Sequence, residues 1–324
     1  MNYTERDSKI GRCPGSAPIL SQAKPAEPIF ESRSVYLKTP FQLGSAELPS
    51  NIFYAPLAGC SDLPYRKMIR KYGKKAGLYF CEMVNLNCGC PVDKVTKDGS
   101  GSGLLRNPLL IGDILSEVVA AVKIPVTVKI RIGWDEDSIV APQVTQIAEQ
   151  AGAKAITIHG RTREQGYKGA ANWEHIRDCK KMAKNILVIG NGDVFDPESA
   201  KNIFDQTLCD GILLARGAMG QPWLAEDIFS YLSGDPVPER GVEDIRSVLL
   251  DHLDTILTYQ NERQALLDFR RVGCWYLKRC ENVKPLRVQL NKAALTQEAL
   301  QLLRTFTWNE VKMAASAQIA DSQE

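Results

Sequence analysis

The sequence repeats one pattern, in which a short apolar run ends in a polar residue and is followed by a helical stretch. The polar residues are spaced 30, 32 and 25 residues apart, at Lys129, His159, Asn191 and Arg216. Short apolar runs that alternate with helices indicate buried parallel strands in βα units. In such units the functional side chains gather at the C-terminal ends of the strands, so we expect a (β/α)8-type (TIM) barrel.

The repeat is short for a complete barrel. It runs from residue 52 to residue 233, a span of 182 residues. Eight units take about 250 residues, or roughly 31 per unit. We therefore expect about six strands, and a sheet of six parallel strands cannot keep the geometry of a closed eight-stranded barrel.

Residues 76–91 carry a thiol at the end of a predicted strand. Apolar and β-forming residues run from Leu78 to Leu86, and Asn87, Gly89 and Pro91 around Cys90 end the run. A thiol at a strand end is placed to react, although a small buried thiol is the commoner case. The residues alone leave both interpretations of Cys90 open.

The composition is that of an ordinary globular protein, with 44% hydrophobic and 24% charged residues. No apolar run reaches the ~18 residues of a membrane span, and the first residues lack the apolar core of a secretory signal. The nine cysteines are scattered among predicted strands and helices, which indicates reduced thiols in a cytoplasmic protein. Their spacing is not that of zinc knuckles, so we expect no metal site and no membrane contact.

Four segments are predicted. Residues 1–34 and 314–324 are polar and without a period, so we expect flexible tails. The barrel takes residues 35–235, with a long loop over residues 94–107. Residues 236–313 are expected to form a helical bundle, with helices over residues 263–280 and 297–313.

The charge is concentrated in this helical part. Residues 263–292 contain eight basic and two acidic side chains, so the segment is +6 while the remainder of the chain is −4. Such runs are often solvated helix faces, but the interleaved Trp275 and Tyr276 favour an RNA-binding surface.

Seven short motifs stand in the order in which they occur in tRNA-dihydrouridine synthases. They are residues 55–62 (Ala-Pro-Leu-Ala-Gly-Cys-Ser-Asp), 81–83 (Cys-Glu-Met), 87–91 (Asn-Cys-Gly-Cys-Pro), 129–134 (Lys-Ile-Arg-Ile-Gly-Trp), 159–162 (His-Gly-Arg-Thr), 190–193 (Gly-Asn-Gly-Asp) and 215–218 (Ala-Arg-Gly-Ala). The chain resembles this bacterial family over residues 53–232. The resemblance implies an enzyme that uses FMN and NAD(P)H, with NADPH as hydride source, to reduce uridine in tRNA to 5,6-dihydrouridine.

The resemblance also assigns roles to individual residues. It implies that Cys90 is the general acid that gives a proton to C5 of uracil while flavin gives hydride to C6, and thiols are mostly protonated at neutral pH. It implies that Asn87 and Arg161 contact the substrate. The cofactor-binding residues that it implies are Pro56, Ala58, Lys129, His159, Asn191, Gly192, Asp193, Arg216 and Gly217.

Two kinds of contact to FMN are expected from this set. Lys129 would offset negative charge on the flavin ring, and His159 would hydrogen-bond the cofactor. The loops at residues 191–193 and 216–217 are expected to hold the phosphate. Glycines let the backbone approach a phosphate, and Arg216 adds a charge-assisted contact.

The chain departs from the family at one place. Three βα units lie in the family between the strand that ends at Pro56 and the one that ends at Cys90, but here only 34 residues separate them. We infer that a segment of roughly two βα units is missing between Met83 and Asn87. Two alternatives to the tRNA-modifying enzyme therefore stay open: a flavin-dependent reductase of a small molecule and an inactive RNA-binding remnant.

Overall fold

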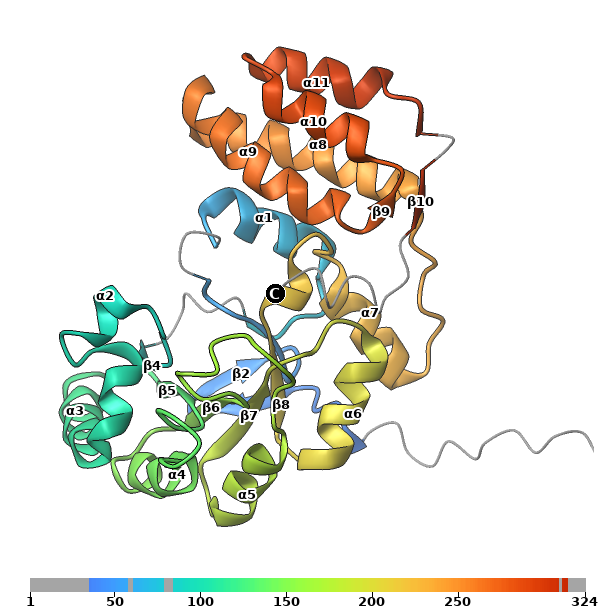
Figure 1. Cartoon of the computed structure of the whole chain (residues 1–324). Coiled ribbons are helices and arrows are strands. Elements are labelled where there is room, and N and C mark those ends of the chain that lie inside the picture. The colour runs from blue at the N-terminus through green and yellow to red at the C-terminus, as the bar shows by residue number, and fades with distance from the viewer. Residues whose placement is uncertain (1–34, 58–60, 79–83, 309–310, 314–324) are drawn as a thin grey trace, which may run out of the picture. The chain divides into compact units, whose positions relative to one another are not determined.

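The computed structural model describes residues 35–57, 61–78, 84–308 and 311–313. Its main sheet has six parallel strands in the order β3-β8-β7-β6-β5-β4 (Figure 1). Their bounds are β3 (Ile52–Tyr54), β4 (Val84–Cys88), β5 (Val126–Arg131), β6 (Ala155–His159), β7 (Leu187–Asn191) and β8 (Gly211–Leu214). The predicted incomplete barrel of about six strands is confirmed.

Helices follow the strands along the chain and pack against one another in sequence from α3 to α7. The helices of this part are α1 (Leu63–Tyr72), α2 (Asp93–Thr96), α3 (Pro108–Ala121), α4 (Ala141–Gln150), α5 (Glu174–Met182), α6 (Pro197–Thr207) and α7 (Leu224–Ser233), with short 3-10 helices η2 (Gly101–Arg106) and η3 (Arg216–Ala218). The long loop predicted over residues 94–107 is wrong, because α2 and η2 occupy most of it.

Strand residues alternate between two cores. Ile130 and Ile158 point outward and are fully buried against the helices. Their sequence neighbours Lys129 and His159 point inward, because successive side chains of a strand lie on opposite faces. The period of two therefore places the polar residues of the repeat inside the sheet, near the C-terminal ends of its strands.

A hairpin closes the other end of the sheet interior. It pairs β1 (Phe41–Leu43) with β2 (Ala46–Leu48) in antiparallel register. Phe41 of this hairpin packs with Phe53 of β3 and Leu213 of β8 in one buried apolar cluster. Apolar side chains thus fill the interior of the sheet near the hairpin. Polar residues occupy the interior at the other end, where the strands reach their C-terminal ends.

The sheet is open between β3 and β4. Leu78 forms a parallel bridge with Phe53, and its carbonyl accepts a 3.0 Å hydrogen bond from the Tyr54 amide. From Val84 onward the chain pairs with β5 instead, and within the described residues β3 and β4 do not pair with each other. The single strand predicted from Leu78 to Leu86 is therefore wrong: the start of this segment lies beside β3 and its end lies beside β5.

The remaining helices build a second core. They are α8 (Val242–Tyr259), α9 (Glu262–Leu277), α10 (Lys284–Lys292) and α11 (Thr296–Thr305). The predicted helices over residues 263–280 and 297–313 both end early, because β9 (Cys280–Glu281) pairs with β10 (Lys312–Met313). Met68 of α1 and Trp223 pack into this second core.

The described residues, from residue 35 to residue 313, fall within one compact unit. The expected division near residue 235 falls between α7 and α8 and stays a prediction. The predicted tails at residues 1–34 and 314–324 lie outside the described residues. Among the described helices, none combines the length and the apolar character that crossing a membrane requires.

Candidate active site

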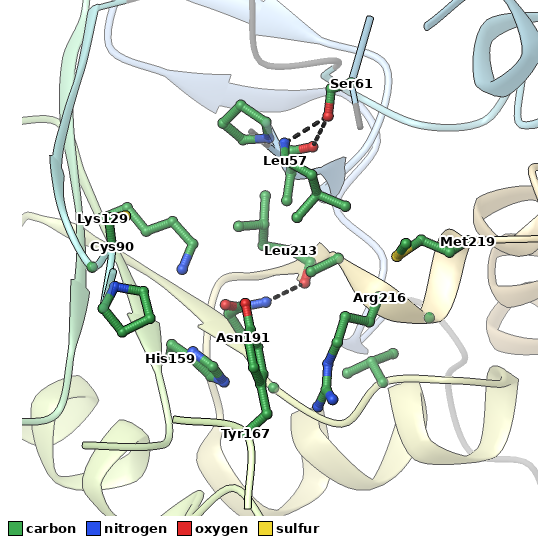
Figure 2. A pocket seen from close by; sticks show the side chains of 18 of the residues that line it. Leu57, Ser61, Cys90, Lys129, His159, Tyr167, Asn191, Leu213, Arg216 and Met219 are labelled. Carbon is green, nitrogen blue, oxygen red and sulfur yellow. Dashed lines mark hydrogen bonds between the residues drawn. The ribbon is translucent and has the colours of Figure 1, made fainter. Parts of the chain in front are cut away.

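A pocket of about 1240 Å³ opens at the C-terminal ends of the strands. Sites for one small ligand are usually about 300–1,000 Å³, so this pocket has room for more than one ring system. Figure 2 shows side chains from successive strands pointing into the same space. The strand-end residues that line it include Pro56, Asn87, Cys90, Lys129, His159, Asn191, Gly192, Asp193, Arg216 and Gly217.

Cys90 is held at the pocket wall by hydrogen bonds to its backbone. The Oδ1 atom of Asn87 accepts from the amides of Gly89 and Cys90, at 3.0 and 3.2 Å. On the other side, the amide and hydroxyl of Ser102 donate to the Cys90 carbonyl, at 3.0 and 2.8 Å. Asn87 and Ser102 therefore fix the loop that carries the thiol.

The thiol of Cys88, two residues earlier, differs from that of Cys90 in its burial and its accessibility. Cys88 is fully buried on the helix side of β4, and burial raises its pKa to about 12. Cys90 is half-buried and lines the pocket. Since β4 ends at Cys88, Cys90 lies in the loop after the strand, and there its thiol faces the pocket wall instead of the helices.

Two nitrogen-bearing side chains of the inner face are electrostatically coupled. Burial, followed by the charge of Arg131, lowers the pKa of Lys129 to about 7. Burial likewise lowers the pKa of His159 well below its usual value, and the charges of Lys129, Arg131, Arg161 and Arg216 add to the effect. His159 is therefore neutral at pH 7, and the surrounding cations favour an anionic ligand.

Asp193 organises the last two loops. Its backbone has a φ of 55°, and its carboxylate makes two 2.8 Å contacts with the guanidinium of Arg161. It also accepts from the Ala171 amide at 2.7 Å and lies 3.4 Å from Arg216. The bidentate pair fixes the loop after β7, since planar guanidinium and carboxylate groups match in geometry.

The loops after β7 and β8 each contain a glycine that a larger residue could not replace. A Cβ on Gly217 would stand 1.9 Å from the Val194 carbonyl oxygen. Gly192 has a φ of +122°, which side chains with a Cβ rarely adopt. The side-chain amide of Asn191 donates a 2.8 Å hydrogen bond to the Leu213 carbonyl and so joins β7 to β8 (Figure 2).

Two predicted residues stand apart from the rest. Arg161 is buried, does not line the pocket, and is occupied by Asp193 and by the Gly169 carbonyl. This position is that of a supporting residue, and its predicted contact with substrate stays a prediction. Ala58 lies outside the described residues.

Arg131 and Tyr167 are among the pocket residues that sequence reasoning missed. Arg131 is almost fully buried, and its guanidinium donates to the carbonyls of Gly89, Thr162 and Gly166, at 3.1, 2.7 and 2.7 Å. The alternation of β5 after Lys129 was a usable signal for it. Tyr167 has its ring 4.5 Å from the Arg216 guanidinium carbon and lies in a loop without a recognisable pattern.

The helical part supplies one wall of the pocket. Asp268, Arg271, Trp275 and Lys278 of and just after α9 line it, together with Gln260. Arg271 lies 3.2 Å from Asp268 and 4.0 Å from Asp62, which caps α1. The described part of the chain holds no group of three or more His, Cys, Asp or Glu side chains that could bind a metal ion.

Comparisons with known proteins agree with the motifs. A family described as dihydrouridine synthase (Dus) matches residues 79–312. The tRNA-dihydrouridine synthase B of Pseudomonas aeruginosa is 32% identical over 318 aligned positions, which span 82% of this chain and 95% of that protein. A probable tRNA-dihydrouridine synthase 1 of Synechocystis is 33% identical, over 82% of this chain and 88% of that protein.

Solved structures add little. A dihydrodipicolinate synthase from Agrobacterium tumefaciens is 13% identical, covers 79% of this chain and 80% of its own, and has a TM-score of 0.34. A similarity at this level supports no conclusion.

The relatives also measure the missing segment. Of the 324 residues, 82% is about 266, so 318 aligned positions leave about 52 positions without a residue of this chain. At roughly 31 residues per unit, 52 positions are close to two βα units. The sequence predicted that loss between Met83 and Asn87, but residues 84–88 form one continuous strand paired with β5, so the break in the sheet lies before Val84. From the matching family, the identities and the shared motifs together, we conclude that this chain belongs to the dihydrouridine synthase family.

Proposed function

We propose that this protein is an FMN-dependent enzyme that reduces uridine in tRNA to dihydrouridine with NAD(P)H as reductant. The observation that carries the proposal is the placement of Cys90, an accessible thiol at the wall of a pocket that also holds Lys129 and Arg131. Family membership supplies the reaction class, and the pocket supplies the groups that this reaction needs.

The chemistry of the pocket fits a flavin. Buried cations favour an anionic ligand, and Lys129 and Arg131 come from the inner face of β5. Gly192, Arg216 and Gly217 line the pocket at the two loops expected to hold the phosphate, and Arg216 can add a charge-assisted contact. Bound flavin supplies the hydride, and the chain's residues hold the ligand and move the proton.

We assign the proton transfer to the Cys90 thiol. Asn87 and Ser102 hold the Cys90 backbone through its amide and carbonyl, which keeps the loop that carries the thiol at the pocket wall. The neutral state of His159 lets it donate or accept a hydrogen bond to a ligand without adding charge. Arg131 and Tyr167 line the same space and are candidates to contact the base.

The substrate must reach the pocket as an extruded base. A base in a folded RNA is stacked, and enzymes that act on it take it out of the stack. The mouth of the pocket has walls from both the barrel and α9, and Trp275 offers a stacking surface there.

The test separates the two half-reactions. Cys90→Ala should slow uridine reduction at least about a hundredfold, the usual contribution of a general acid, and leave flavin reduction by NADPH nearly unchanged. Cys274→Ala is the matched control, because Cys274 is also half-buried but does not line the pocket. Stopped-flow traces with equal losses in both half-reactions would remove Cys90 from this role.

The open sheet edge supports an inactive RNA-binding remnant as a second candidate. A barrel without two units lacks part of the wall around its pocket, and cofactor affinity depends on that wall. An absence of flavin binding at any added FMN concentration, with tRNA still bound, would favour this alternative. Reduction of small enones with no tRNA binding would instead favour a small-molecule reductase.

A further inference from the structure

We propose that the outward face of α1 binds the phosphate backbone of the RNA substrate; this inference rests on the proposed function. The buried side of α1 consists of Pro64, Tyr65, Met68 and Ile69. The cationic residues on the other side and in the turn that follows, here called the α1 cationic face, are Arg66, Lys67, Arg70, Lys71, Lys74 and Lys75.

The α1 cationic face has a single sign of charge. From Leu63 to Leu78 the sequence holds these six basic residues and no Asp or Glu. All of them are exposed except Arg66, which is half-buried. Such a ridge attracts a polyanion, because each cation that meets a phosphate releases a condensed counterion.

Neighbouring elements only partly offset this charge. Asp251 of α8 pairs with Lys71, whose side chain is nevertheless 59% exposed. Lys67 contacts the phenol oxygen of Tyr259. Lys75 lies 5.0 Å from the ring centre of Phe229. Glu226 of α7 accepts a 3.1 Å hydrogen bond from the Lys75 backbone amide. The side chains of Lys67, Lys71 and Lys75 are held in place by their contacts and stay exposed at the surface.

The α1 cationic face begins at the rim of the pocket. Ser61 and Asp62, the two residues before α1, line the pocket, and Arg66 donates to the Ser61 carbonyl at 2.8 Å. Lys67 contacts Tyr259, and the next residue, Gln260, also lines the pocket. An RNA strand that places one base in the pocket can thus pass directly over α1.

The basic stretch predicted from sequence does not form a comparable face. Arg270 donates to the Ala293 carbonyl at 2.6 Å, and Arg271 is paired with Asp268 and Asp62. Burial lowers the pKa of Arg279 to about 10. Folding therefore divides the +6 segment among internal contacts, the pocket wall and separate exposed positions at Arg263, Lys284 and Lys292, whereas α1 presents its cations together.

RNA fits this face better than a membrane surface does. Helices that lie on membranes bury a broad apolar side in the lipid. The apolar side of α1 is already packed inside the protein, and Leu63 is the exposed apolar residue of this helix, with 41% of its surface exposed. Charge without an apolar side is what phosphate contacts require.

The test measures tRNA affinity against salt concentration with a triple variant, Lys67→Gln, Arg70→Gln and Lys71→Gln. Glutamine keeps helix propensity and removes charge. The matched control, Lys123→Gln, Lys154→Gln and Lys184→Gln, changes three exposed lysines just before β5, β6 and β7, at the opposite ends of the strands. Circular dichroism melting and bound flavin check that both triples fold.

The α1 triple should bind unmodified tRNA about tenfold or more weakly at low salt, with a salt slope reduced by about 2 to 3, since each phosphate contact contributes about 0.7–0.9. The control triple should bind like the parent protein. Equal losses in both triples would mean a general charge effect, and unchanged affinity in the α1 triple would mean a solvated face; either result overturns the inference. A parent protein that does not bind tRNA at all would instead refute the proposed function.

Discussion

At the scale of single residues, the pocket places charge where burial disfavours it. Lys129 and Arg131 both have lowered pKa values, chiefly because burial penalises their charged forms. Such a cost persists in a folded protein when a ligand offsets it. In the flavin-free protein no ligand offsets the free-energy cost of burying these charges. The free energy of unfolding should therefore depend on pH.

Lys129→Met tests that cost. The folded protein loses the Lys129 proton near pH 7, whereas the unfolded chain keeps it until about pH 10.4. The unfolded state binds more protons between these values, so the free energy of unfolding rises with pH. In Lys129→Met, urea denaturation at pH 7, 8 and 9 should show a shallower rise, by up to about one proton. Lys154→Met is the exposed control, and identical slopes in all three proteins would contradict the enclosed position of Lys129.

At the scale of elements, the sequence pattern predicted the strands of the main sheet but not the short helices or the pairing of distant segments. The strands that end near Lys129, His159 and Asn191 were predicted to within a residue or two, because buried parallel strands are continuous apolar runs. The loop at residues 94–107 was missed as α2 and η2, since short helices lack a period. The end of α9 was missed because a distant segment, β10, pairs with the chain just after it.

Side-chain pairing was even less accessible from sequence. Arg161 was expected at the substrate, but its contacts with Asp193 and Gly169 depend on how two loops meet. Likewise, the +6 segment reads as one surface in sequence and is divided by folding. Composition gives the charge of a segment, and the packing of helices decides where each charge points.

The contact of α8 with α9 contains a titratable group that burial keeps neutral. His252 Nδ1 lies 3.1 Å from the Tyr276 hydroxyl, and Nε2 is buried without a hydrogen-bond partner among the described residues. Burial, then the charge of Arg271, lowers the pKa of His252 to about 3. The unfolded chain takes up this proton near pH 6.5, so it binds more protons between pH 3 and 6.5.

His252→Gln should therefore weaken the loss of stability on acidification. The free energy of unfolding should fall less steeply between pH 6.5 and 4 than in the parent protein, by up to about one proton. His175→Gln, at a half-buried position on α5, is the matched control. Chemical denaturation at a series of pH values measures the slopes, and a slope unchanged in His252→Gln would refute the buried neutral histidine.

At the scale of the whole molecule, the open edge sets the limits on function. Four of the implied cofactor residues, Lys129, His159, Asn191 and Arg216, come from β5 to β8 and their loops, where the sheet is continuous. The missing units belong between Leu78 and Val84, on the opposite side of the pocket. The continuous part of the sheet thus positions the residues on one side of the pocket. Because the other side lacks two units, we expect weaker flavin binding and a less stable fold than in a relative with a full barrel.

The most direct test of the account is dihydrouridine formation in unmodified tRNA as a function of added FMN, with NADPH in excess. The chain is compared with a version in which roughly 50 residues, the length of the missing units, are restored between Leu78 and Val84. We predict that both proteins form dihydrouridine and that the chain without the insert needs about tenfold or more FMN for half-maximal rate, a difference of about 1.4 kcal/mol in cofactor binding. No dihydrouridine at saturating FMN, or full activity of both proteins without added FMN, would contradict the account.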